Sequence, residues 1–556
     1  MFREFRKQAE RALKKVLKAE GVELEIKFEE PLGEFGDISS PVCLELASRL
    51  RKSPSKIAEE FVEKVDVKEE SFIRDVKAIN GHINFYLDYE RFSLDLIKQV
   101  KRLGRDYGRG DKEGRIVLEH TSANPNGPLH IGHGRNAIIG DTLDRVLRFS
   151  GYDVETQYYV NDMGKQLAKV VWGLRRFQSK KEKVDHKIAE VYFEANKAIE
   201  ENPELEKEIS KLMTGYEAGE KEITREFEDA VNFCLEGIKE TLDRLDIKHD
   251  QFIWESRFSR DGTVGAVLKK LEDTKYAKKD EVLYLDLTDF GIEKEMVLLR
   301  LDGTTLYPTR DIAYHLWKKD QGVVIDIWGA DHKLAALQLD AVMKILGEDT
   351  PEFIIYEFIS LPEGSMSTRR GVFISVDDLI DESVKRAYDE VDKRRLGETR
   401  EFKEEVPNSV GVGAVRFNII RVAPEKSMVF RWEEALDFER QGSPFIQYAF
   451  ARACRILEKT EVSDDFNTHE LTDFERDLIR TISRFPLLVE EAAETRRPYL
   501  LANYAMELSD AFHRFYMHNK VLGTKEEDLR VNLVMATKIT LGNVLNLLGL
   551  DALEAM

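Results

Sequence analysis

The stretch SANPNGPLHIGHGRNAIIGD, from Ser122 to Asp141, constrains the fold more than any other part of the chain. It follows an apolar run at 115–119 that is typical of a buried strand, and after Gly134 the apolar residues recur at helical spacing. A second strand-like run comes at 154–160. This order of strand, loop, helix and strand predicts two parallel strands joined by a right-handed crossover, as in doubly wound α/β sheets.

The loop and the helix start inside this stretch carry residue types that suit a phosphate group. Ligands of doubly wound sheets bind where strands end and helices begin, and the N–H groups of a helix N-terminus attract anions. His130 and His133 are three residues apart, so both can lie on one side of the first turn. Gly132 and Gly134 lack a Cβ and leave room for a ligand against the backbone.

We therefore predict a nucleotide site at this helix start. A His-x-x-His pair taken alone is more often incidental, and it is occasionally part of a metal site. The preceding strand, the following helix and the glycines between them favour the catalytic interpretation. The sequence contains neither a GxxxxGK[S/T] loop nor a GxGxxG loop, so the site uses neither of these two phosphate cradles.

The length of the chain and its few cysteines limit the classes of protein to which it can belong. The chain has 556 residues, too many for one core, and 42% of them are hydrophobic, so several globular domains are expected. Its three cysteines, Cys43, Cys234 and Cys454, form neither a CxxC pair nor a disulfide framework. The chain also lacks a signal-peptide core and an apolar run of about 18 residues, so we expect a cytoplasmic protein with no membrane partner.

The charge is strongly acidic overall but locally basic. A net charge of −20 argues against simple nucleic-acid binding. Residues 1–18, however, carry seven Lys or Arg against two Glu, and Arg452 and Arg455 lie in another positive stretch. Local basic surfaces of this kind allow an acidic protein to bind a phosphate backbone.

The segment PLHIGHGRN resembles the HIGH signature of class I aminoacyl-tRNA synthetases. A second segment, MSTRRG at 366–371, resembles the degenerate KMSKS loop of arginyl-tRNA synthetases, and the whole chain is similar to the archaeal type of that family. Further segments that resemble family motifs are spread over nearly the whole chain: FGD at 35–37, INF at 83–85, EHTSAN at 119–124, NDMGKQ at 161–166, LYPTRD at 306–311, WGADH at 328–332, QYAFAR at 447–452 and FHRFY at 512–516.

The resemblance implies a fold with several parts. The expected class is α/β, with a Rossmann-type parallel-sheet catalytic domain, a small α+β N-terminal domain and an all-α bundle of the DALR type that binds the anticodon. A strand at 82–87 and a charged helical insertion, expected to be solvated helices rather than an editing pocket, fit this plan. The expected parts are 1–101 (N-terminal, contacting tRNA), 102–375 (catalytic, with the insertion at about 165–246), 376–430 (helical connection) and 431–556 (anticodon binding), and the polar stretch 102–114 is expected to be a linker.

The resemblance also implies an activity. An arginyl-tRNA synthetase activates L-arginine with ATP to give arginyl-adenylate and pyrophosphate, then transfers arginine to the 3′-terminal ribose of tRNA(Arg). The family typically activates arginine only when tRNA is bound. Mg²⁺ accompanies the ATP, no structural metal is expected, and the chain is expected to act as a monomer.

The site residues follow from the motifs and from the chemistry of arginine. Carboxylates recognise a guanidinium through paired, charge-assisted hydrogen bonds, and a neutral analogue would leave them unpaired. Glu119 is a further acid, expected to orient Asn124 or the substrate amine. The predicted catalytic residues are His130, Gly132, His133, Met366, Ser367, Thr368, Arg369 and Arg370. The predicted arginine-binding residues are Glu119, Ser122, Ala123, Asn124, His133, Glu255, Tyr307, Asp311 and Asp331, and those for tRNA are Tyr448, Arg452, Arg455, Tyr516 and Met556.

The chain departs from the family pattern at two positions. Gly127 stands where many members have a lysine before HIGH, and Ser365 stands at the first lysine of KMSKS. Arg369 and Arg370 are the candidates for the missing positive charge. Three other interpretations stay open: a nucleotidylyltransferase, which is usually far shorter, a class I synthetase for another amino acid, and a catalytically impaired tRNA-binding paralogue.

Overall fold

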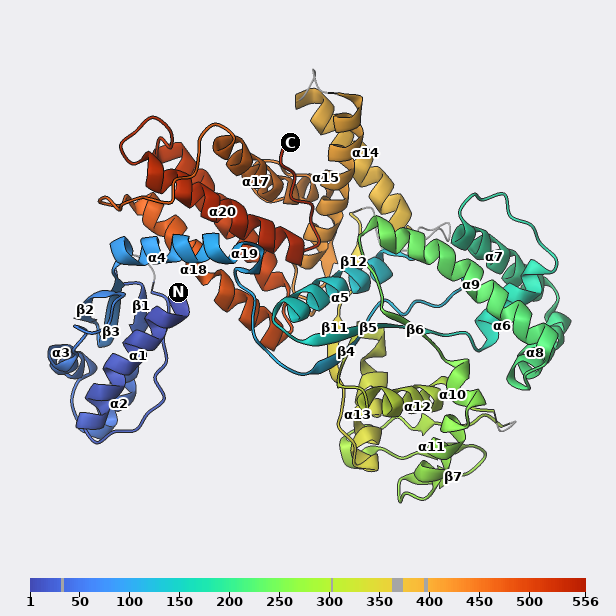
Figure 1. The fold of residues 1–556 in the computed structure, drawn as a ribbon. Coiled ribbons are helices and arrows are strands. Elements are labelled where there is room, and N and C mark those ends of the chain that lie inside the picture. Colours follow the sequence, from blue (N-terminus) through green and yellow to red (C-terminus); the bar gives the residue numbers. More distant parts are fainter. Residues whose placement is uncertain (32–34, 302–303, 363–373, 395–398) are drawn as a thin grey trace.

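The computed structural model describes residues 1–556 except 32–34, 302–303, 363–373 and 395–398. Figure 1 shows a small N-terminal domain at one end, a central sheet with its helices, and a helical C-terminal part packed beside the sheet. This arrangement confirms the predicted fold class, in which an α/β catalytic domain is joined to a small α+β domain and an all-α domain.

The N-terminal domain packs helices against a three-stranded antiparallel sheet of order β1-β3-β2. Ile83, Phe85 and Leu87 alternate along β3 and are buried, which confirms the predicted strand. The carboxylate of Asp37 accepts a hydrogen bond from the N–H of Leu87 at 2.7 Å. The elements of this domain are α1 (Phe2–Ala19), β1 (Ile38–Ser40), α2 (Val42–Leu50), α3 (Pro54–Lys64), β2 (Ile73–Ile79), β3 (His82–Leu87) and α4 (Tyr89–Leu103).

The central sheet has five parallel strands in the order β11-β10-β4-β5-β6. β4 is the first of these in the chain and lies between β10 and β5, so a topological switch point lies beside it. The strands predicted at 115–119 and 154–160 are β4 and β5, and the predicted helix between them is α5. The bounds are β4 (Arg115–Glu119), α5 (Ile131–Phe149), β5 (Asp153–Val160), β6 (Gln251–Trp254), β10 (Val323–Gly329) and β11 (Glu352–Tyr356).

Four helices between β5 and β6 form the predicted insertion. Each of these helices buries one apolar face and also has exposed residues. The rings of Tyr216 and Phe227 stack with their centroids 4.2 Å apart, and the Tyr216 hydroxyl donates to the carboxylate of Asp162, just after β5. The insertion is therefore fixed to the carboxyl end of the central sheet. Its helices are α6 (Lys165–Leu174), α7 (Val184–Glu201), α8 (Glu206–Glu217) and α9 (Lys221–Arg244).

A second, smaller core is built from residues of β6 and of the elements that follow it as far as α13. A short antiparallel sheet of order β7-β8-β9 packs there with helices α11 to α13. Ile312, Ala313 and Tyr314 of α12 are buried in this core, which fixes the first turns of that helix. The bounds are α10 (Ser256–Arg260), α11 (Thr263–Glu272), β7 (Ala277–Lys279), β8 (Leu283–Leu285), β9 (Met296–Val297), α12 (Tyr307–Lys319) and α13 (Lys333–Leu346).

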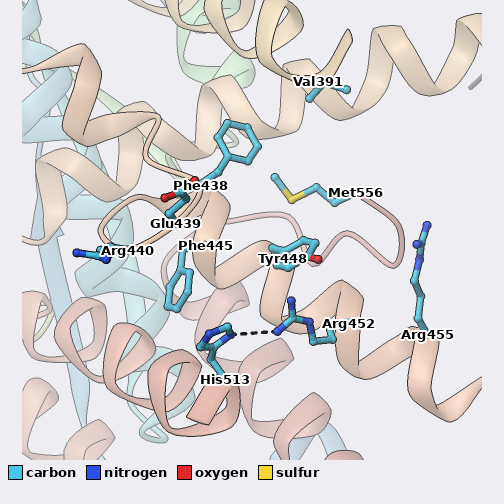
Figure 2. A pocket seen from close by; sticks show the side chains of 10 residues that line it. All are labelled: Val391, Phe438, Glu439, Arg440, Phe445, Tyr448, Arg452, Arg455, His513 and Met556. Atoms are coloured by element: carbon cyan, nitrogen blue, oxygen red, sulfur yellow. Dashed lines mark hydrogen bonds between the residues drawn. The ribbon is translucent and has the colours of Figure 1, made fainter. Parts of the chain in front are cut away.

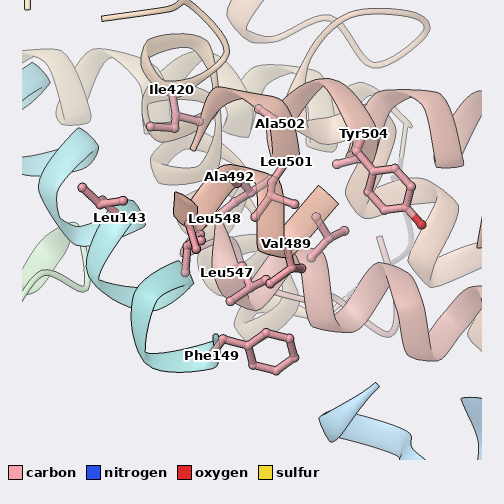
Figure 3. Close-up of a cluster of buried hydrophobic side chains, with 14 of the residues drawn as sticks. Leu143, Phe149, Ile420, Val489, Ala492, Leu501, Ala502, Tyr504, Leu547 and Leu548 are labelled. Atoms are coloured by element: carbon pink, nitrogen blue, oxygen red, sulfur yellow. The ribbon is translucent and has the colours of Figure 1, made fainter. Parts of the chain in front are cut away.

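The C-terminal part is helical and packs directly on α5. Leu143 and Phe149 of α5 share a buried cluster with Leu547 of α20 and with residues of α15, α18 and α19 (Figure 3). The buried guanidinium of Arg416 in α15 pairs with the carboxylate of Asp141 in α5. The bounds are β12 (Ile359–Ser360), α14 (Val376–Arg394), α15 (Arg400–Ile420), β13 (Met428–Val429), α16 (Trp432–Ala435), α17 (Ser443–Leu457), α18 (Asp473–Thr495), α19 (Tyr499–His518) and α20 (Glu527–Leu547).

The stretch 102–114, expected to be a linker, is anchored to these helices at Tyr107 and Gly108, and most of its other residues are exposed or half-buried. The Tyr107 side chain is buried, and its hydroxyl donates to the carbonyl oxygen of Ile482 at 2.9 Å. At Gly108, where φ is +95°, a Cβ would lie 2.4 Å from the Phe485 ring. Among the described helices, none combines the length and the apolar composition needed to cross a membrane.

Candidate active site

The carboxyl ends of the central strands surround a cavity of about 330 Å³. Segments that follow β4, β5, β6 and β10 contribute to its wall, as expected at the switch point of a doubly wound sheet. The predicted site residues that line it are Glu119, Ser122, Asn124, His130, Gly132, His133, Glu255, Tyr307, Asp311 and Asp331.

Two groups of predicted residues are not in this wall. Ala123 is buried, and its carbonyl oxygen accepts a hydrogen bond from the Tyr158 hydroxyl at 2.7 Å. Its methyl group thus packs in the core and does not line the cavity. The predicted residues Met366, Ser367, Thr368, Arg369 and Arg370 lie outside the described residues, together with Ser365.

His130 and His133 cap the first turn of α5 reciprocally. Nδ1 of His130 accepts the N–H of His133 at 3.2 Å, and Nδ1 of His133 accepts the N–H of His130 at 3.4 Å. The two rings stack with their centroids 3.5 Å apart. This arrangement satisfies two helix-terminal N–H groups and fixes both rings beside a helix N-terminus, where anions are favoured.

The protonation state of this pair follows from its surroundings. Burial lowers the pKa of both imidazoles, and burial together with the neighbouring His130 lowers the pKa of His133 to about 3. Each Nδ1 accepts a backbone N–H, so each neutral ring carries its proton on Nε2. At neutral pH the pair therefore offers N–H donors, not positive charges, to phosphate oxygens.

The glycines around this motif serve the packing of the protein. A Cβ on Gly134 would lie 2.8 Å from Cγ2 of Val376 in α14, so the space predicted for a ligand is filled by the protein itself. The N–H of Val376 also donates to the carbonyl oxygen of Leu129 at 2.8 Å. A Cβ on Gly127 would lie 3.1 Å from the Cβ of Ala189 in α7. Residue 127, where many family members have a lysine, therefore lies close to the insertion.

The loop after β4 has a strained backbone that hydrogen bonds hold in place. Thr121 and Ser122 have φ values of +70° and +37°, in the left-handed region that non-glycine residues rarely adopt. The side-chain oxygen of Asn136 accepts the N–H of Thr121 at 2.7 Å. The Ser122 hydroxyl donates to Oε1 of Glu119 at 2.9 Å and accepts the N–H of Tyr159 at 3.0 Å. These bonds fix the cavity wall between β4 and β5.

Glu255 is a buried acid at the end of β6. Its Oε1 accepts a hydrogen bond from Nε of Arg310. Its Oε2 accepts one at 2.7 Å from the side-chain nitrogen of Asn161, in the amide orientation that satisfies both ends of that amide. Burial raises the pKa of Glu255 to about 7 although Arg310 acts against this rise. A cation entering the cavity would therefore stabilise the ionised form of this carboxylate.

Helix α12 presents a second acid and an aromatic ring to the same cavity. Tyr307 and Asp311 are one turn apart, as predicted, and both line the wall; Tyr307 is 65% exposed. Asp331 is an exposed acid at the rim. With Glu255, these residues give the cavity an acidic end suited to a planar cation.

A buried ion network holds Glu119. Nζ of Lys318 lies 2.6 Å from Oε2 of Glu119 and 2.5 Å from Oδ1 of Asp326, and Nε2 of His315 lies 2.9 Å from Oδ2 of Asp326. Glu119, His315 and Asp326 have the donor atoms of a metal site, but the Lys318 ammonium lies between the two carboxylates. The carboxylate of Glu119 is thus already engaged by the protein, with Lys318 and with Ser122.

Two residues that pair with wall carboxylates, Arg310 and Lys318, were not among the predicted site residues. Arg310 precedes Asp311 in the LYPTRD segment, so the motif that indicated Asp311 could also have indicated Arg310. Lys318 gave no such signal, because a lysine near a helix end is usually exposed. The amide of Asn124 donates to Oε1 of Gln166 at 3.1 Å, and this partner was not predicted.

A second cavity, of about 720 Å³, lies among the C-terminal helices (Figure 2). The Arg452 guanidinium lies 4.7 Å from the ring centroid of Tyr448 and 4.8 Å from that of Tyr516, and its Nη1 is 3.1 Å from Nδ1 of His513. The predicted residues Tyr448, Arg452, Arg455 and Met556 line this cavity, and Tyr516 reaches it through its contact with Arg452. His513 also lines this cavity and falls inside the FHRFY segment, but it was not among the predicted residues.

Three protein families match this chain, and their matches together cover most of its length. The family described as tRNA synthetases class I (R), catalytic domain, matches residues 96–432. The arginyl tRNA synthetase N terminal domain matches residues 3–87, and the DALR anticodon binding domain matches residues 446–556.

Individual proteins of the same family are similar to this chain over nearly its full length. The protein named Arginine--tRNA ligase from Methanocaldococcus jannaschii is 52% identical over 97% of this chain and 98% of its own length. That of Methanothermobacter thermautotrophicus is 48% identical over 100% of both chains. The structure of the Thermus thermophilus arginyl-tRNA synthetase superposes with a TM-score of 0.84 at 28% identity, covering 99% of this chain and 100% of that one. The chain belongs to the class I arginyl-tRNA synthetase family.

Proposed function

We propose that this chain is an arginine–tRNA ligase. It activates L-arginine with ATP to give arginyl-adenylate and pyrophosphate, then transfers the arginyl group to the 3′-terminal ribose of tRNA(Arg). The observation that carries the proposal is the acidic end of the cavity, with Glu255 and Asp311, beside the histidine pair at the helix start. Membership of the family supports the same reaction.

Arginine is held at the acidic end of the cavity. Glu255 and Asp311 pair with the guanidinium, and the Tyr307 ring lies against it. Asn124 and Asp331 hold the amino and carboxyl groups at the other end, near Ser122 and His133. A neutral side chain would leave two partly desolvated carboxylates without a counter-charge, so the site discriminates without a separate editing pocket.

Adenylate formation takes place at the helix start. The arginine carboxylate attacks the α-phosphate of ATP, the bond to the pyrophosphate breaks, and pyrophosphate leaves. Nε2–H of His130 and of His133 donate hydrogen bonds to the phosphate oxygens as negative charge develops, and Gly132 lies in the same wall. Residues 366–370 act on the departing pyrophosphate, with Arg369 and Arg370 as its cations.

Mg²⁺ enters as part of the ATP complex. It neutralises phosphate charge when bound, and most of its ligands are phosphate and water oxygens. The exposed carboxylate of Asp331 is the type of oxygen ligand that suits this ion.

The second cavity receives anticodon nucleotides. Single-stranded bases stack on aromatic rings and on guanidinium planes, and Arg452 with Tyr448 and Tyr516 offers both surfaces. Arg455 adds a charge for the phosphate backbone, and Met556 lies in the same wall. The basic N-terminal helix gives the N-terminal domain a surface for another part of the tRNA.

Arginine activation depends on bound tRNA. Helix α5 begins with the histidine pair, and its middle is joined to the C-terminal part by the buried pair of Asp141 and Arg416. Buried Arg135 of α5 also donates to the carbonyl oxygens of Glu357 at 2.7 Å and of Lys426 at 2.8 Å. A shift of the C-terminal helices on tRNA binding therefore moves the helix that carries the catalytic pair.

The enzyme works as a monomer in the cytoplasm. A single chain supplies the described walls of both cavities. The three cysteines are free and buried, which suits a reducing compartment. Light scattering after size-exclusion chromatography tests the oligomeric state.

Pyrophosphate exchange with each of the twenty amino acids, with and without tRNA, tests the proposal. Exchange with arginine that appears only with tRNA is the expected result. Exchange with another amino acid would refute the specificity, and tRNA-independent exchange would refute the coupling. No exchange by the folded protein, with tight binding of an adenylate analogue, would identify a tRNA-binding paralogue and point to Gly127 and Ser365 as the cause.

A further inference from the structure

One buried polar atom in the wall of the arginine cavity has no partner in the described part of the chain. The hydroxyl of Tyr159, on β5, is screened from solvent and makes no hydrogen bond there. Tyr159 is also among the residues that line the cavity, together with Glu255, Tyr307 and Asp311. Buried hydroxyls normally have a partner, because leaving one unsatisfied is costly.

The ring that carries this hydroxyl is firmly placed. It stacks on the ring of Tyr314 with the centroids 4.4 Å apart and the planes inclined by 15°. Tyr314 is itself fixed, since its hydroxyl donates to Oε1 of Gln157 at 2.8 Å and the Lys318 ammonium lies 4.3 Å from its ring centroid. The N–H of Tyr159 donates to the Ser122 hydroxyl at 3.0 Å. Both the backbone and the ring of Tyr159 are therefore held, and its hydroxyl is preorganised.

The charges around the hydroxyl indicate which part of a substrate it meets. Burial first, and then the negative charges of Glu255 and Asp311, raise the pKa of Tyr159, so the hydroxyl stays protonated. Both acids line the same cavity as Tyr159. A planar cation placed between these acids has more N–H groups than two carboxylates use, because a guanidinium carries five. The hydroxyl oxygen is a fitting acceptor for one of them.

We propose that Tyr159 is a specificity-determining residue, whose hydroxyl oxygen accepts a hydrogen bond from the guanidinium of bound arginine. This inference rests on the proposed function. It adds a neutral acceptor to the two acids, so the site recognises the geometry of the guanidinium as well as its charge. A lysine ammonium at the same place would have three donors on one nitrogen and would not match three separate acceptors.

Tyr159→Phe tests the proposal, because it removes one oxygen and keeps the stacked ring. We expect the KM for arginine to rise about tenfold or more, in line with the loss of a hydrogen bond to a charged group, while the KM for ATP stays the same. The melting temperature of the free variant should be equal to that of the parent or higher, because the substitution removes an unsatisfied polar atom.

Tyr314→Phe is the matched control. It makes the same chemical change in the same stack, but its hydroxyl is already bonded to Gln157 and does not line the cavity. This variant should lose stability and keep the KM for arginine. An unchanged arginine KM in Tyr159→Phe would overturn the proposal, as would an equal rise in both variants.

A failure of the proposed activity and a failure of the role of Tyr159 give different experimental results. If the parent protein with tRNA does not activate arginine, the proposed function fails. If the parent activates arginine and Tyr159→Phe does so with the same KM, only the role of Tyr159 fails.

Discussion

Replacing Glu255 with glutamine separates the effect of this carboxylate on the stability of the fold from its effect on arginine binding. Glu255 is buried, and burial raises its pKa from 4.5 to about 7, so ionising it in the folded chain is unfavourable. At about 1.4 kcal/mol per pKa unit, the ionised carboxylate lowers the free energy of unfolding by about 3 kcal/mol above pH 7. Glutamine keeps the shape without the charge. Glu255→Gln should therefore be more stable than the parent by about that amount at pH 8.

The stability difference should shrink as the pH falls. Between pH 7 and 4.5 the folded chain binds a proton at Glu255 that the unfolded chain does not bind, so the penalty on the parent declines towards lower pH. At about pH 5.5 the advantage of the variant should be roughly 1.4 kcal/mol. Hydrogen exchange of amides in β6 and α12 measures it locally, which suits a chain of several domains that does not unfold in one step.

Substrate affinity should move in the opposite direction. Loss of a charge-assisted hydrogen bond should raise the KM for arginine by roughly 10- to 150-fold at pH 8 and leave the KM for ATP unchanged. A variant that is less stable than the parent at pH 8, or a difference that does not depend on pH, would refute the reasoning. Either result would mean that Arg310 keeps Glu255 ionised in the folded chain at little cost.

Three other substitutions test separate parts of the site. His133→Ala should leave the fold intact and slow adenylate formation. Because the pKa of His133 is about 3, this group should cause no loss of rate in the parent between pH 8 and pH 6. An inflexion of the parent's pH–rate profile near pH 6 that disappears in the variant would contradict this expectation. Lys318→Met leaves Glu119 buried without its counter-charge and Asp326 with His315 alone, and should cost about 3–5 kcal/mol, seen as a lower melting temperature. Arg452→Ala should raise the KM for tRNA about tenfold in aminoacylation while arginine KM at saturating tRNA stays constant; a changed arginine KM would show that this cavity acts on the catalytic domain.

The central βαβ unit was predictable because its signals are local and agree with one another. The apolar run at 115–119, the helical spacing after Gly134 and the alternation at 154–160 each specify one element, and the short connections leave few ways to arrange them. Wall residues such as Glu255 and Asp311 were predictable as family-like acids near the starts and ends of elements. Residues that follow parallel strands gather at one edge of the sheet, so their convergence follows from topology.

The side chains that form hydrogen bonds with the wall carboxylates from inside the protein were not predictable in the same way. The bond of Arg310 to Glu255 joins residues 55 apart in the chain, and that of Lys318 to Glu119 joins residues 199 apart. A single sequence contains no signal for such pairs, and polar residues in charged helices are usually exposed. Tyr159 has the pattern of an ordinary strand residue, and only the packed structure shows that its hydroxyl has no internal partner among the described residues.

The charges of the described wall explain how one cavity can accept a cation and a polyanion together. Its lining holds four carboxylates, those of Glu119, Glu255, Asp311 and Asp331, and no lysine or arginine among the described residues. Lys318 pairs with Glu119 and Arg310 with Glu255, so mainly the more exposed Asp311 and Asp331 attract arginine and repel the phosphates of ATP. The neutral histidine pair adds hydrogen bonds but no positive charge. Bound arginine reduces the excess of negative charge, so it makes the later approach of ATP less unfavourable. The remaining positive charge has to come from outside this wall, from Mg²⁺ and from the arginines proposed at 369 and 370.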